Sequence, residues 1–113
     1  METLIIIVVA VLFLVWRMKP TKGVRSISAH QLKQELNDSN KVYIDVRTPA
    51  EFKARNIKQF KNMPLGSDLS KLPKDKEIIV ICQSGMRSAQ ACKQLKKLGY
   101  EKVTNVRGGI GSY

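Results

Sequence analysis

A run of four apolar residues, Ile78–Ile81, limits the fold of this chain more than any other segment. A strand that is apolar on both faces is typical of the middle of a parallel sheet, where other layers cover each face. Residues 42–46 and 103–106 have the composition of further short strands, and a helical pattern runs from about Arg87 to a Gly99 cap. Strands that alternate with helices predict an α/β fold with a mainly parallel sheet.

Two capping boxes indicate where further helices begin. Ser28 is followed by Gln31 at the spacing of one box, and Thr48 is followed by Glu51 at the spacing of the other. We expect Phe52 to anchor the second of these helices in the core.

The N-terminal residues form a separate, strongly apolar segment. Apart from Ala10, every residue from 4 to 15 is Leu, Ile, Val or Phe. As a helix, residues 1–18 would be about 27 Å long, close to the roughly 30 Å hydrocarbon core of a bilayer. A cleavable signal peptide is the alternative, but Glu2 stands where such peptides carry basic residues, and no small-residue cleavage site follows. We therefore predict one transmembrane signal-anchor helix over residues 1–18.

Charges beside this segment predict its orientation. The basic residues that follow it are Arg17, Lys19, Lys22 and Arg25, whereas Glu2 precedes it. The positive-inside tendency then places the C-terminal part in the cytoplasm. The predicted organisation is an anchor over residues 1–18, a basic linker over residues 19–25 and one cytoplasmic domain over residues 26–113.

The net charge of +11 comes largely from lysines scattered through residues 33–102. Nucleic-acid binding uses dense basic runs or interleaved aromatic residues, so we expect no nucleic-acid partner. A basic surface instead attracts anionic substrates or anionic lipids. Two cysteines and a single histidine, His30, do not supply a metal site or a disulfide framework, and we expect no metal and no cofactor.

Cys82 directly follows the central predicted strand, and a helix is expected to begin about five residues later. Active sites in open α/β sheets lie at the carboxyl ends of the strands. Ser84 and Gly85 allow the loop to turn tightly with its N–H groups inward, and the helix dipole adds positive potential. These features favour a reactive thiolate at Cys82 over an inert core cysteine. Cys92, on the apolar face of the following helix, is expected in the core.

The chain from residue 26 onward resembles a single-domain rhodanese, a family of sulfurtransferases. The matching segments are Tyr43-Ile44-Asp45-Val46-Arg47-Thr48-Pro49-Ala50-Glu51-Phe52, Asn62-Met63-Pro64, the loop 82–88, Leu98-Gly99-Tyr100 and Gly108-Gly109-Ile110. The resemblance implies a five-stranded, mainly parallel sheet flanked by helices. It also implies transfer of a sulfane sulfur, often from thiosulfate, through a cysteine persulfide to a thiophilic acceptor. The implied partners are a small anionic sulfur donor and a thiol or protein acceptor.

The resemblance implies roles for individual residues. Cys82 would be the catalytic nucleophile. The residues that would bind substrate, mainly through backbone N–H groups, are Gln83, Ser84, Gly85, Met86, Arg87 and Ser88. Arg87 would close the loop and attract anionic donors. Asp45, Arg47 and Glu51 would support the site structurally, with Arg47 ion-paired to Glu51.

Loop length distinguishes sulfur transfer from phosphate chemistry. Phosphatases with a cysteine nucleophile have five residues between Cys and Arg, whereas four residues separate Cys82 from Arg87. The smaller loop suits a sulfur atom and favours a thiosulfate sulfurtransferase-like enzyme. Arg55-Asn56 stands where many relatives have Gly-His, which motivates an alternative, a non-catalytic module that binds a protein partner at the membrane. Thiol-based redox or persulfide carriage between partners is a third possibility.

Overall fold

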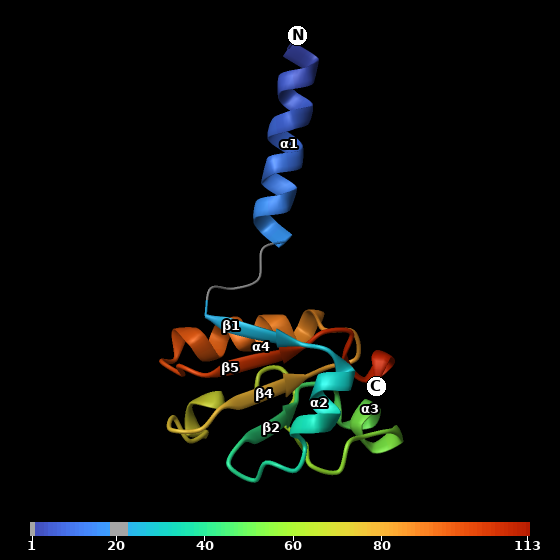
Figure 1. Ribbon diagram of the computed structural model, residues 1–113, viewed down its shortest axis with the longest axis vertical. Coiled ribbons are helices and arrows are strands. Elements are labelled where there is room, and N and C mark those ends of the chain that lie inside the picture. Colours follow the sequence, from blue (N-terminus) through green and yellow to red (C-terminus); the bar gives the residue numbers. More distant parts are fainter. Residues whose placement is uncertain (1, 19–22) are drawn as a thin grey trace.

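The computed structural model describes residues 2–18 and 23–113 (Figure 1). Within these residues the strands form a five-stranded sheet in the order β1-β5-β4-β2-β3, and all neighbouring strands are parallel. The strands are β1 (Val24–Ile27), β2 (Val42–Asp45), β3 (Lys61–Asn62), β4 (Ile78–Ile81) and β5 (Val103–Val106). The predicted α/β fold with a parallel sheet is confirmed, and β4 is its fully buried central strand.

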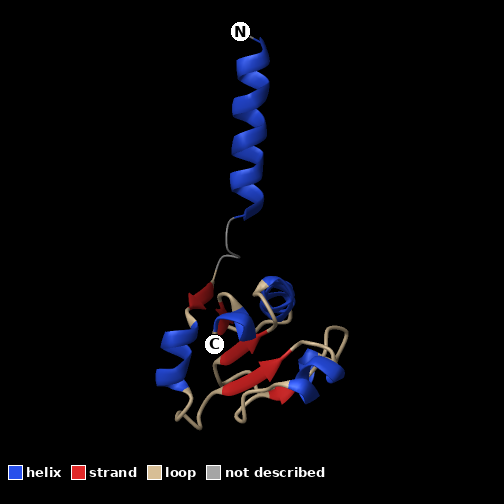
Figure 2. Cartoon of the chain, turned by 90° about the vertical axis from the view of Figure 1, so that its right-hand side faces the viewer, coloured by secondary structure: helices blue, strands red, loops and turns tan. Residues whose placement is uncertain are grey.

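Helices cover both faces of this sheet (Figure 2). They are α2 (Ala29–Glu35), α3 (Pro49–Ala54) and α4 (Met86–Lys97), with short 3-10 helices η1 (Leu69–Lys71) and η2 (Gly109–Ser112). Side chains of β4 alternate between two apolar clusters: Ile78 and Val80 pack with α4, whereas Ile79 and Ile81 pack with α2. The central strand therefore fixes both layers at once.

Both predicted capping boxes are present. The Ser28 hydroxyl accepts a hydrogen bond from the Gln31 backbone N–H, and the Thr48 hydroxyl accepts one from the Glu51 N–H. In each box the side-chain oxygen of the third helical residue accepts a hydrogen bond from the backbone N–H of the cap residue, so two N–H groups at the helix start gain partners.

The prediction that Phe52 anchors α3 in the core is wrong, because α3 has no buried residue. Ile57 and Phe60, which follow α3, fill this part of the core instead. The Phe60 ring packs edge-to-face on Tyr43, with ring centroids 5.3 Å apart.

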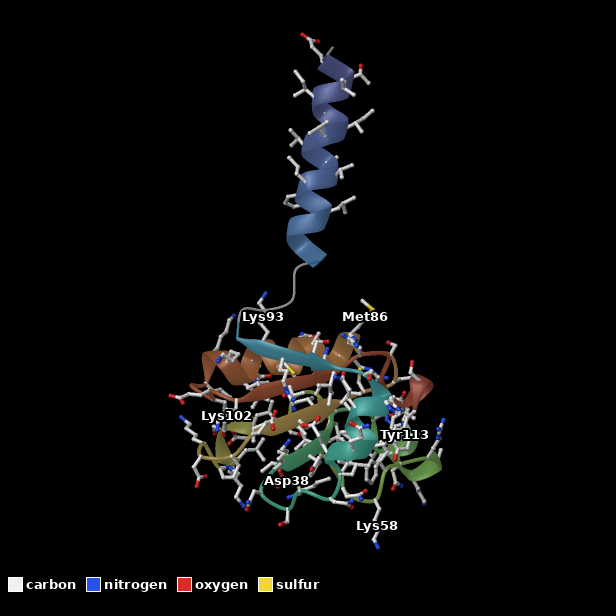
Figure 3. All side chains as sticks on the ribbon, in the orientation of Figure 1. Asp38, Lys58, Met86, Lys93, Lys102 and Tyr113 are labelled. Carbon is white, nitrogen blue, oxygen red and sulfur yellow. The ribbon has the colours of Figure 1, made fainter. Side chains whose placement is uncertain are left out.

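The N-terminal helix α1 (Glu2–Met18) projects away from the sheet in Figure 1. The large apolar side chains from Leu4 to Leu14 are exposed around the helix (Figure 3). The predicted transmembrane helix is not supported, since no helix within residues 2–18 and 23–113 is both long and apolar enough to cross a membrane. Met1, part of the predicted span, lies outside the described residues.

The segment predicted as a linker over residues 19–25 falls largely outside the described residues, which resume at Gly23. Its last two positions, Val24 and Arg25, already belong to β1, which pairs with β5. Strand β1 lies at the edge of the sheet and buries only Ile27. The continuous run of apolar residues that marks the central strand is missing from β1.

Candidate active site

Cys82 lies at the carboxyl end of the central strand, as predicted, and its side chain is fully buried. Four residues later the chain has entered α4, whose N-cap is Gly85. Gly85 has a φ of 103°, a conformation that glycine adopts without strain, and its N–H donates a hydrogen bond to the Cys82 Sγ at 3.0 Å. A Cβ at Gly85 would also lie 3.3 Å from the Gly108 nitrogen. Glycine is thus required here both for the turn and for close packing.

Hydrogen bonds control the ionisation of the Cys82 thiol. Burial raises its pKa, but bonds from the Ser88 hydroxyl and from the backbone N–H groups of Ser88, Gly85 and Ser84 outweigh burial, so the pKa of Cys82 is lowered. The Ser88 Oγ lies 3.3 Å from the Cys82 Sγ. Cys92 behaves in the opposite way, because burial, followed by the nearby Cys82, raises its pKa to about 12. The two cysteines therefore have distinct chemistry, and the predicted core position of Cys92 is confirmed.

The turn after β5 is hydrogen-bonded to the first two residues of the loop. The Ile110 N–H donates to the Cys82 carbonyl at 2.9 Å, and the Gly111 N–H donates to the Gln83 carbonyl at 3.0 Å. Gly109 approaches so closely that a Cβ there would lie 2.1 Å from the Cys82 carbonyl oxygen. The backbone turns tightly at Gly108 and Gly109, with φ values of 73° and 56°.

The charged residues near the site have different partners from those predicted. Arg47 is ion-paired with Asp45, with 2.9 Å between Nη2 and Oδ2, and the two side chains are 2% and 0% exposed. The predicted ion pair between Arg47 and Glu51 is wrong, since Arg47 reaches only the backbone carbonyl of Glu51, at 3.4 Å. The Asp45 carboxylate also accepts a hydrogen bond from the Arg47 backbone N–H at 3.0 Å, so it holds both the backbone and the guanidinium of Arg47.

The Glu51 carboxylate instead pairs with Arg87, through bonds of 2.6 and 2.9 Å. The side-chain hydrogen bond from Arg87, followed by the backbone bond from Thr48, lowers the pKa of Glu51 to about 2. This pair joins the first turn of α4 to the start of α3. Arg87 is therefore held by a carboxylate, and the backbone N–H groups and the α4 dipole supply the rest of the positive potential at the loop.

Three other loop residues lie on the exposed side of the loop. Gln83 and Ser84 are exposed, and Met86 is 81% exposed and points away from the sheet (Figure 3). The Gln83 Oε1 accepts a hydrogen bond from Arg47 at 3.5 Å, which links the exposed side of the loop to the buried pair of Arg47 and Asp45. Gln83, Ser84 and Met86 thus lie on the exposed side of the loop that follows Cys82.

Asn105 on β5 belongs to the site but was not predicted from the sequence. Its Oδ1 accepts a hydrogen bond from the Ser88 hydroxyl at 2.5 Å, and its Nδ2 donates to the Gly85 carbonyl at 3.4 Å. The available signal was weak: a side-chain amide in a short strand that leads into Gly108 and Gly109.

A thiolate with several N–H donors around it can act as a nucleophile without a metal. Among residues 2–18 and 23–113, no group of three or more His, Cys, Asp or Glu side chains could hold a metal ion. His30 is exposed on α2.

The rhodanese-like domain family matches residues 28–113 of the chain. A sulfurtransferase from Allochromatium vinosum is 40% identical over 91 residues, which cover 77% of this chain and 85% of that protein. The crystal structure of a rhodanese-like domain protein from Staphylococcus aureus superposes with a TM-score of 0.69 at 32% identity, covering 78% of this chain and 89% of that one. A rhodanese-related protein from Thermoplasma volcanium superposes with a TM-score of 0.68 at 37% identity, covering 78% and 88% of the two chains.

Proposed function

The chain belongs to the rhodanese-like domain family, and on this basis we propose that it is a sulfurtransferase that carries a sulfane sulfur on Cys82. The observation that carries the proposal is the surroundings of the Cys82 sulfur, which accepts a bond from the Gly85 N–H at the carboxyl end of β4. These surroundings lower the pKa of the thiol, and a thiolate is the form that attacks sulfur.

The proposed reaction has two displacement steps. In the first, the Cys82 thiolate attacks the outer sulfur of thiosulfate, a new S–S bond forms, and sulfite leaves with the electrons of the broken S–S bond. In the second, a thiolate of the acceptor attacks the outer sulfur of the Cys82 persulfide, and the bond to Cys82 breaks to regenerate its thiolate. Each step conserves the sulfane sulfur and needs no outside oxidant or reductant.

The loop would stabilise the charge on the outer sulfur. Backbone N–H groups from Gln83 to Ser88 are the donors that we assign to this sulfur and to the donor's oxygens, in the manner of an oxyanion site. The ion pair between Arg87 and Glu51 would hold the loop closed, and the buried pair of Arg47 and Asp45 would support it from below. The net charge of +11 favours an anionic donor over a neutral one.

Sulfur loading tests the proposal directly. The full chain is incubated with thiosulfate under conditions that leave thiols unblocked, and its mass is measured without reduction. We expect an addition of about 32 Da, the mass of one sulfur atom, that Cys82→Ser abolishes and Cys92→Ala retains. Cys92→Ala is the matched control because it removes a buried thiol outside the loop. Sulfur retained by Cys82→Ser, or none gained by the parent chain from any sulfane donor, would contradict the assignment.

A non-catalytic module that binds a protein partner is the alternative. Arg55 and Asn56, which depart from the family pattern, end α3 and are exposed: the Asn56 amide donates to the Phe52 carbonyl at 2.9 Å. In that case Arg55 and Asn56 would form part of the surface on which the partner docks. Normal cellular function of Cys82→Ser, together with loss of function in Asn56→Ala, would favour this alternative over sulfur transfer.

We also propose that α1 attaches the domain to a membrane, with the domain on the cytoplasmic side. The exposed apolar side chains of α1 and the basic residues that follow it in the sequence support this location. Cell fractionation of the full chain should place it with membranes, and Leu12→Asp, a charge in the middle of α1, should release it. Recovery of both proteins in the supernatant would refute the attachment.

A further inference from the structure

The Ser88 hydroxyl lies between two groups that compete for its single hydrogen. Its Oγ is 3.3 Å from the Cys82 Sγ and 2.5 Å from the Asn105 Oδ1. Ser88 itself is fully buried. Asn105 reaches it from β5, where it is paired in register with Val80, two residues before Cys82. Residues paired across strands, and residues two apart along a strand, share a face, which places Asn105 beside the sulfur.

The direction of the hydrogen bonds follows from Asn105. Its Nδ2 faces the Gly85 carbonyl, which can only accept, so its Oδ1 must face Ser88. Two oxygen atoms in contact need a hydrogen between them, and the amide oxygen has none to give. The Ser88 hydroxyl therefore donates to Asn105, and the remaining contact is one in which the Cys82 S–H donates to the Ser88 Oγ. This arrangement is the one that suits a protonated thiol.

A thiolate can only accept, so the Ser88 hydroxyl stabilises it only by turning to the sulfur and giving up its bond to Asn105. The Asn105 oxygen would be left against a Ser88 lone pair, and rotation of the amide would set that oxygen against the Gly85 carbonyl. The backbone N–H groups of the loop favour the thiolate throughout, whereas the Ser88 hydroxyl favours it only at the expense of Asn105.

We propose that Asn105 is a positioning residue for sulfur transfer, which holds the Ser88 hydroxyl away from Cys82 and so keeps the sulfur from being over-stabilised as a thiolate. A thiolate whose charge is strongly stabilised attacks more slowly, since nucleophilicity falls as thiol pKa falls. Asn105 thus lowers the fraction of Cys82 that is ionised but makes the thiolate that does form more reactive. The inference rests on the proposed function for its meaning, but the thiol chemistry it predicts can be measured without any sulfur donor.

Replacing Asn105 leaves the other titratable residues around Cys82 in place. They are Arg87 and Cys92 on α4, Glu51 on α3, the buried pair of Asp45 and Arg47 after β2, and Arg107 after β5. A shift in the titration of Cys82 on replacing Asn105 can therefore be assigned to Ser88 when it disappears in a chain without the Ser88 hydroxyl.

The test measures alkylation of Cys82 by iodoacetamide as a function of pH, with peptide mass spectrometry to separate Cys82 from Cys92. In Asn105→Ala of the full chain we expect the midpoint to move to lower pH, with an increase of about tenfold in the thiolate-to-thiol ratio at a fixed pH. The plateau rate should fall about threefold, because a more stabilised thiolate is less nucleophilic. Asn105→Val, which suits a strand and also lacks an acceptor, should give the same result and guards against poor folding of one variant.

Two comparisons isolate the mechanism. In the Ser88→Ala background, Asn105→Ala should change neither midpoint nor plateau, since the competed hydrogen is gone. Asn62→Ala is the matched control: its amide donates to the carbonyls of Asp45 and Arg47 and does not contact Ser88, so the Cys82 midpoint should stay in place. An unchanged or raised midpoint in Asn105→Ala, or an equal shift without Ser88, would overturn the inference. If the alkylation shifts are as expected but the chain gains no sulfur, the proposed function is overturned and the competition between Asn105 and Cys82 for the Ser88 hydrogen still holds.

Discussion

Replacing Gly109 by alanine should damage the site from outside the loop. The added Cβ would lie 2.1 Å from the Cys82 carbonyl oxygen and 2.7 Å from the Gln83 carbonyl carbon, so the turn after β5 must move away. Movement breaks the bonds from the Ile110 and Gly111 N–H groups, each of which contributes about 1 kcal/mol. The left-handed backbone at Gly109 adds about 1 kcal/mol for a residue with a Cβ.

We therefore expect Gly109→Ala to lower the free energy of unfolding by about 3 kcal/mol, measured by urea denaturation. The Cys82 carbonyl would lose its partner, so sulfur loading should slow more than tenfold under conditions where the variant is still folded.

Gly66→Ala is the matched control. Gly66 also has a positive φ, of 96°, but a Cβ there meets nothing within 4 Å. Its replacement should cost about 1 kcal/mol for the backbone alone and leave sulfur loading unchanged. Equal losses in the two variants, or normal loading by Gly109→Ala, would refute the claim that the turn positions Cys82.

Three further outcomes follow from the charged groups. Arg47→Met leaves the Asp45 carboxylate buried without its partner and should lower the free energy of unfolding by about 3 to 5 kcal/mol; a smaller loss than in an exposed-charge control would contradict this. The pKa of Glu51 is about 2, below its ordinary value of 4.5, so its pair with Arg87 stabilises the fold above that ordinary value and is lost as pH falls towards 2. Glu51→Gln should make the unfolding midpoint vary less with pH between about 2 and 4.5. An unchanged pH dependence would contradict a stabilising role for the pair of Glu51 and Arg87. Because the pKa of Cys82 is lowered, its alkylation should continue at a pH where an ordinary cysteine has stopped reacting, and a profile like that of free cysteine would contradict the hydrogen-bond assignment.

The inner strands and the position of Cys82 could be predicted because local composition determines them. Ile78–Ile81 is apolar on both faces, and only the middle of a layered sheet buries such a strand. The cysteine then lies at the carboxyl end of the strand whatever the details of the loop. In contrast, β1 buries a single residue, so its membership of the sheet depends on pairing with β5, a distant segment.

Side-chain partners were harder to predict than strands. The spacing of Arg47 and Glu51 is that of a helical pair, but Arg47 precedes the helix and turns inward to Asp45. Asn105 could not be assigned because its role depends on the register that sets it opposite Val80. Such contacts are tertiary and leave no local pattern in the sequence.

The two edges of the sheet are short. Strand β3 has two residues, and at the other edge β1 has four, including Arg25, which is held by Glu35 and Glu77 in a cluster of ion pairs. Unpaired N–H and C=O groups at a long, apolar edge are templates on which another chain can add a strand. A two-residue edge and a charged one offer little for such pairing, so the sheet is protected against edge-to-edge aggregation. Stronger β-propensity at Arg25, as in Arg25→Val, should remove this protection and promote aggregation at high concentration.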